Sequence, residues 1–123
     1  MLNLSFTLLL LAAAFGTVLA GLHLRAGRVR PPSWVFGALH GLIGIIGLVL
    51  LFPVLQGPPR GEAMGVGGFG SIAAVLLVLG LLASLALAAA RLRRKRPPGL
   101  AIGIHATLAV SGVVILAAYA LLG

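Results

Sequence analysis

The chain has 123 residues, of which 61% are hydrophobic and 8% are charged, and its mean hydropathy is +1.23. Soluble domains carry about 25% charged residues, so this composition excludes an ordinary soluble protein and predicts an integral membrane protein. The sequence contains no cysteine, which excludes disulfides, thiolate metal sites and iron–sulfur clusters. A metal site in this chain would therefore have to use histidine.

Positive charge is concentrated in two short segments between apolar runs. Nine Lys and Arg oppose one acid, Glu62, for a net charge of +8. Short basic loops stay on the cytoplasmic side of a membrane, where they meet anionic lipid headgroups. We therefore expect membrane lipids rather than nucleic acid as partners, a bacterial-type inner membrane location, and both termini outside. Eight of the nine basic residues lie in these segments: Arg25, Arg28, Arg30, Arg91, Arg93, Arg94, Lys95 and Arg96.

The first apolar run predicts a membrane helix over residues 2–22. No basic segment precedes it, whereas Arg25 follows it, so the pattern favours a first span over a cleaved secretory signal. Pro31 and Pro32 then introduce a second helix over residues 33–55. Its Trp34 is placed to lie at the membrane interface.

A loop rich in glycine and proline over residues 56–70 leads to the second half of the chain. We expect a third helix over residues 71–90, where Gly80, Ser84 and Ala88 form a stripe that permits close helix packing. Pro97 and Pro98 introduce a fourth helix over residues 99–122. About 20 apolar residues are needed to cross a membrane, so the four runs predict an all-α integral membrane protein. The expected architecture is one domain, 1–123, folded as an up-down bundle of four transmembrane helices.

The second and fourth runs repeat one another. RPPSWVFGALHGLIGIIGLVLL begins at Arg30 and RPPGLAIGIHATLAVSGVVILA begins at Arg96, and the two match at the Arg-Pro-Pro start, the histidine and the aliphatic tail. This match predicts a duplicated two-helix hairpin, with halves of approximately 1–55 and 66–123 and the two copies in parallel orientation. His40 and His105 are equivalent in this alignment, whereas His23 has no counterpart.

His40 and His105 are the chemically distinctive residues of the apolar runs. An ionisable side chain is costly inside a membrane and calls for a reason. The two histidines follow their proline pairs at nearly equal distances, so we expect them at one depth on two diagonal helices, where they can hold one iron ion between them. A porphyrin also needs short side chains around it. We expect these at Gly37, Gly41 and Gly44 beside His40, and at Gly112 on the face of His105.

One histidine on each of two level, glycine-flanked helices in a four-helix membrane bundle resembles the bis-histidine b-type cytochromes. These proteins serve as membrane anchors and quinone-linked electron carriers. The resemblance implies one haem b with His40 and His105 as its axial iron ligands, and electron transfer with a quinone or a larger respiratory complex. If haem is present, we expect its propionates to point toward His23. No nucleophile stands beside a base, so an electron carrier or subunit is favoured over a stand-alone enzyme.

A second interpretation needs no cofactor. A neutral histidine between helices can donate to a backbone carbonyl or to a serine or threonine, and glycines are common packing devices in membrane helices. The chain would then be an accessory or structural subunit of a larger membrane complex or a homo-oligomer. Zinc or copper fits less well, because two imidazoles alone leave the coordination sphere short. A small multidrug-type antiporter would need a carboxylate in the first helix, whereas Glu62 lies in a loop.

Overall fold

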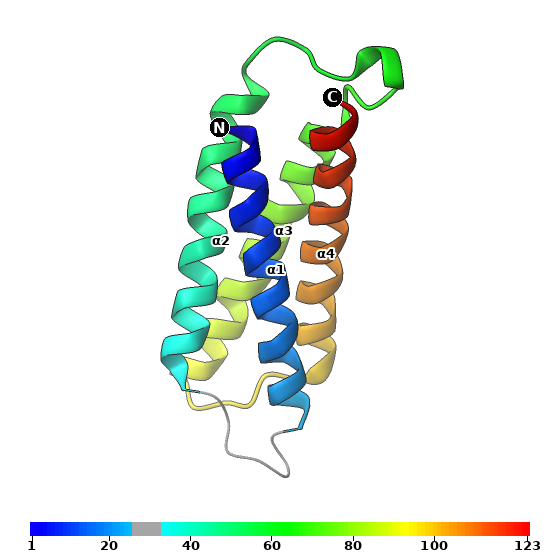
Figure 1. Ribbon diagram of the computed structural model, residues 1–123. Helices are drawn as coiled ribbons and strands as arrows, with labels where there is room; N and C mark the ends of the chain where they lie inside the picture. Colours follow the sequence, from blue (N-terminus) through cyan, green and yellow to red (C-terminus); the bar gives the residue numbers. More distant parts are fainter. Residues whose placement is uncertain (26–32) are drawn as a thin grey trace.

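The computed structural model describes residues 1–25 and 33–123, and these residues are all-helical. Four long helices, α1 (Leu2–Leu24), α2 (Trp34–Leu55), α3 (Phe69–Leu92) and α4 (Gly99–Leu122), are joined by loops, one of which carries the 3-10 turn η1 (Glu62–Met64) (Figure 1). Each long helix has the length and apolar composition needed to cross a membrane. The predicted four-helix membrane bundle is therefore confirmed.

The helix ends differ slightly from those expected. Residues 34–55 and 99–122 are helical as predicted, with Ser33 as the cap of α2, where its hydroxyl accepts from the Val35 amide at 3.3 Å. The predicted α1 and α3 were too short: α1 ends at Leu24 instead of residue 22, and α3 runs from Phe69 to Leu92 instead of over residues 71–90. His23 and Arg91 occupy their last turns, where positive charge is favourable beside the exposed carbonyls.

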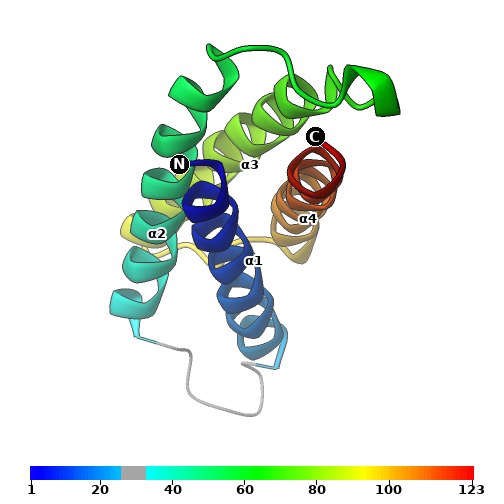
Figure 2. The same ribbon diagram turned by 45° about the horizontal axis from the view of Figure 1, so that its top comes forward.

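The helices run alternately up and down, so both termini lie at one end of the bundle together with the loop that carries η1 (Figure 1). The opposite end carries Arg25 and the α3–α4 connection. Around the bundle the order is α1, α2, α3 and α4, which makes α2 and α4 diagonal (Figure 2). Packing is most extensive between α1 and α2 and between α3 and α4. The molecule is thus built of two hairpins that meet less closely.

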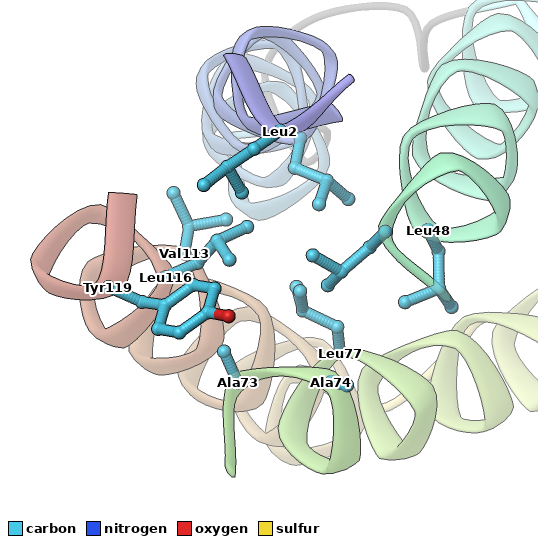
Figure 3. Packing of buried hydrophobic residues seen from close by; sticks show 10 residues of the cluster. Leu2, Leu48, Ala73, Ala74, Leu77, Val113, Leu116 and Tyr119 are labelled. Atoms are coloured by element: carbon cyan, nitrogen blue, oxygen red, sulfur yellow. The ribbon is translucent and has the colours of Figure 1, made fainter. Parts of the chain in front are cut away.

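The core is a narrow column where the four helices meet. Leu51 of α2 and Leu116 of α4 have no solvent-exposed area, and side chains from all four helices converge around them (Figure 3). Most of the other large apolar side chains, such as Trp34 at 68% exposed, lie on the outer faces. An outer surface of this kind is suited to lipid rather than water.

The two hairpins make matching contacts. A β-carbon added at Gly47 of α2 would lie 2.8 Å from Cγ of Leu9 in α1. A β-carbon added at Gly112 of α4 would lie 2.8 Å from Cγ of Leu77 in α3. Each hairpin therefore closes with a leucine packed against a glycine at the equivalent place, which is the geometry that a duplicated hairpin produces.

Candidate functional site: the histidine pair between the hairpins

His40 of α2 and His105 of α4 face one another across the centre of the bundle. Their ring centroids are 5.9 Å apart and their planes are nearly perpendicular, at 87°. Both rings are half-buried. The structure therefore brings the two histidines together from diagonal helices, with no side chain packed between the rings.

Each imidazole is anchored by a carbonyl of the other helix in its own hairpin. Nδ1 of His40 lies 3.0 Å from the Ala12 carbonyl oxygen in α1, and Nδ1 of His105 lies 2.9 Å from the Gly80 carbonyl oxygen in α3. Because a carbonyl oxygen only accepts, Nδ1 must carry the hydrogen in both rings. An imidazole whose single hydrogen is on Nδ1 keeps a lone pair on Nε2, the nitrogen that can bind a metal ion.

Gly16 supports His40, and the sequence interpretation missed it. A β-carbon at Gly16 would lie 2.7 Å from Cε1 of His40, so the imidazole occupies the space of the missing side chain. The only sequence signal is an isolated glycine inside a helical pattern, which often has a packing reason. Ser84 occupies the equivalent position in the second hairpin, and its hydroxyl donates to the Leu81 carbonyl at 2.9 Å.

A second difference between the two rings is aromatic. The Phe15 ring of α1 lies edge-on to His40, with centroids 6.4 Å apart, and edge-on to Phe36 of α2 at 6.2 Å. His40 therefore has aromatic neighbours that the repeat alone does not predict.

A cavity of about 60 Å³ adjoins the pair and is lined from all four helices. A smaller one of about 40 Å³ lies on the α1 and α4 side, and both histidines line it as well. The larger cavity has room for a few water molecules. Its walls near the rings are made by small residues, which include Ala12, Gly41, Gly44, Gly80, Ser84 and Ala109.

The predicted glycines fall in three different environments. Gly41 and Gly44 line the larger cavity. Gly37 is exposed, and a β-carbon there would meet nothing within 4 Å. Gly112 lies in the tight contact with Leu77 and is not among the residues that line either cavity. The structure therefore groups Gly41 and Gly44 with the histidines and places Gly37 and Gly112 apart from them.

His23 lies in the last turn of α1, about 10 Å along the helix from Gly16. Its Nδ1 lies 3.2 Å from the Leu19 carbonyl, and Nη1 of Arg91 approaches its Nε2 at 3.5 Å. Arg91 holds the equivalent place in α3, because the register that pairs Leu9 with Leu77 also pairs His23 with Arg91. His23 therefore has no histidine counterpart in α3: an arginine holds the equivalent place, and the two residues meet across the bundle.

The basic residues gather at this same end of the molecule. Arg25 and residues 91–96 lie there, whereas Glu62 and Arg60 lie in the loop at the opposite end (Figure 1). Arg28 and Arg30, which were also predicted to lie in a cytoplasmic loop, are outside the described residues. The charge asymmetry between the two ends therefore holds for the part of the chain that the structure describes.

The donor set of the site is limited to the two imidazoles. Within residues 1–25 and 33–123, no group of three or more His, Cys, Asp or Glu is placed to hold a metal ion. A bare ion at the pair would therefore have two protein ligands, whereas haem iron needs only two beyond its porphyrin. No protein-family model, curated protein or solved structure matches the chain.

Proposed function

We propose that His40 and His105 hold one haem b between the two hairpins, and that the protein carries electrons in the membrane. The observation that carries this proposal is the 5.9 Å separation of two facing imidazole centroids. A metal–nitrogen bond of about 2.0 Å on each side, together with the radii of the two rings, separates the centroids by about 6 Å. The spacing is therefore close to that of two rings on one metal ion, and the edge-to-face rings would have to turn for both Nε2 atoms to reach it.

The hydrogen bonds of the pair support the same role. A histidine that binds a metal ion commonly donates its other ring N–H to a carbonyl or carboxylate, which fixes the tautomer and the orientation of the ring. His40 and His105 each donate Nδ1–H to a carbonyl oxygen, at 3.0 and 2.9 Å. Both Nε2 atoms are thereby kept free of hydrogen and available to iron.

The space beside the pair is too small for a porphyrin as it stands, so haem binding would require the hairpins to move apart, and this movement would also widen the separation of His40 and His105. Sites for cofactors and other small molecules enclose about 300–1,000 Å³, whereas the larger cavity encloses about 60 Å³. On α1 and α3, the positions that line the two cavities include Ala12, Gly16 and Gly80. Because these residues are small, α1 and α3 do not fill the space beside the histidines. Contacts between the hairpins are less extensive than contacts within them, so separation at this level disrupts the weaker interface.

A haem b held by both His40 and His105 would supply one-electron transfer, with no position left for oxygen. The protein's own part is to hold the two ligands, exclude water with apolar helices, and place the site closer to the basic end of α2 and α4 than to the other end. The electron partners we propose are a membrane quinone or a larger respiratory complex, on the cytoplasmic side of the bilayer's midplane in a bacterial-type inner membrane.

Replacing each histidine separately tests the proposal. We expect protein produced with ample haem to show the Soret band and α/β bands of low-spin haem b. His40→Ala and His105→Ala should each abolish or convert this spectrum, because iron would lose one axial ligand. His23→Ala is the control and should retain it, because His23 lies away from the pair. A colourless wild-type protein, or an unchanged spectrum in His40→Ala, would contradict the proposal.

A cofactor-free accessory subunit is the second candidate, and one observation favours it. The Nδ1 atoms already have acceptors and the rings already touch edge to face, so the pair is also a complete packing unit without a ligand. In that case His40→Ala would lower the stability of the bundle while the wild-type protein would remain colourless with haem supplied.

A further inference from the structure

We infer that Gly16 is the positioning residue of His40: its missing side chain leaves the space that the imidazole occupies, so that the ring can dock on the Ala12 carbonyl of α1 by Nδ1–H. The consequence for haem rests on the proposed function. The docking of His40 itself does not, and it can be tested in protein without haem.

Helix geometry explains why this position matters. In an α-helix the carbonyl of one residue accepts the amide hydrogen four residues later, so the Ala12 carbonyl points toward Gly16. The second lone pair of that oxygen accepts from Nδ1 of His40, 3.0 Å away. A β-carbon at residue 16 would tilt back toward the preceding turn. It would lie 2.7 Å from Cε1 of His40 and 3.3 Å from both ring nitrogens.

The atom that such a β-carbon meets belongs to a side-chain ring rather than to a backbone. A ring can turn about its two side-chain torsions, whereas helices that collide must separate. Gly16→Ala should therefore move the imidazole and break its hydrogen bond to Ala12 while the helices stay in place. This selectivity makes Gly16 a residue that sets the orientation of His40 rather than the approach of α1 to α2.

The second hairpin shows that the requirement is specific to His40. Ser84 holds the place equivalent to Gly16, yet His105 keeps its hydrogen bond to Gly80 at 2.9 Å. A β-carbon at Gly80 would lie no closer than 3.5 Å to any atom outside its own helix backbone, which is an ordinary contact. The two imidazoles thus make equivalent hydrogen bonds but have different residues, Gly16 and Ser84, at the equivalent helix position. Substitution at residue 16 should affect one ligand only.

The first measurement uses haem-free protein in detergent with ¹⁵N-labelled histidine rings. The wild-type His40 signals, assigned by their loss in His40→Ala, should show hydrogen on Nδ1. Gly16→Ala should change the tautomer or the shifts of His40 and leave those of His105 in place. Gly21→Ala is the matched control on the same helix, because a β-carbon there meets nothing within 4 Å. Hydrogen on Nε2 in the wild type, or an unchanged His40 in Gly16→Ala, would overturn the inference.

The second measurement is haem binding, read as affinity and as the low-spin spectrum. Loss of the hydrogen bond that orients a metal ligand costs about 10- to 100-fold in affinity. We expect a loss of this size in Gly16→Ala, with wild-type behaviour in Gly21→Ala. Haem binding that is equally tight in Gly16→Ala and in the wild type overturns the inference. A wild-type protein that binds no haem overturns the proposed function instead, and the ring signals then decide the positioning role alone.

Discussion

At the residue scale, several polar side chains inside the apolar helices donate to backbone carbonyls. The buried Ser5 hydroxyl donates to the Gly47 carbonyl of α2 at 2.8 Å, and Thr7 and Thr17 donate to carbonyls one turn earlier in α1. His40 and His105 follow the same rule through Nδ1. In hydrocarbon no water is present to take over these bonds, so a side chain must find its partner within the bundle. The histidines differ from the serine and threonines because each has a second ring nitrogen, Nε2, that takes no part in this hydrogen bond.

The tight glycines of the two hairpins give a matched pair of predictions. Gly47→Ala and Gly112→Ala should each destabilise the protein by about 1–3 kcal/mol, because a β-carbon would press on Leu9 or Leu77 at 2.8 Å. Unfolding in detergent measures the effect. Gly103→Ala is the control, since a β-carbon there meets nothing within 4 Å. An effect of Gly103→Ala as large as the other two would contradict the assignment of these contacts.

Part of this residue-level picture could be predicted from the sequence. His40, His105, Gly41 and Gly44 follow from helical spacing and the repeat, because both can be recognised in the sequence without knowing how the helices pack. Gly16 could not be predicted, since its role depends on which carbonyl the His40 ring reaches on a different helix. The meeting of His23 with Arg91 was missed for the same kind of reason. The Arg-Pro-Pro match aligns α2 with α4 but does not fix the register between α1 and α3.

At the element scale, the glycines of α2 differ in position: Gly41 and Gly44 line the larger cavity, whereas Gly37 does not. Gly44 lines the larger cavity, so Gly44→Leu should fill space that a porphyrin needs and should lower the haem content severalfold. Gly37→Leu should leave haem content near the wild-type value, because Gly37 is exposed with open space beside it. The ratio of haem to protein in purified samples measures both. Equal losses in the two variants would contradict this division of the α2 face.

The helices themselves were predictable because each one is a continuous apolar run bounded by prolines, glycines or charges. Only the ends of α1 and α3 differed. His23 and Arg91 look like loop residues by hydropathy, yet they extend their helices, since long basic side chains are compatible with the last turn and can reach the membrane surface. The cavity was not predictable in size, because it depends on how closely two hairpins approach.

At the scale of the whole molecule, the placement of charge predicts one orientation in the membrane. Both termini share an end of the bundle, and Arg25 and residues 91–96 lie at the other (Figure 1). Because short basic loops remain in the cytoplasm, we expect both termini outside. Two reporters fused after Gly123 test this orientation. A reporter that works only outside the cytoplasm should give a signal, and a reporter that works only in the cytoplasm should give none. The reverse pattern would contradict the orientation. Arg93→Lys and Arg94→Lys are suitable controls, since they preserve charge and should not alter it.

The central claim is that one haem binds per chain, shared by His40 and His105. Titration of the haem-free protein in detergent with haem, followed by the Soret band, tests it most directly. We expect saturation at one haem per chain with a low-spin spectrum, because two imidazoles from diagonal helices fill both axial positions. His40→Ala and His105→Ala should each fail to give that spectrum at the same haem concentration. A wild-type titration without saturation, or one that the two variants reproduce, would contradict the claim.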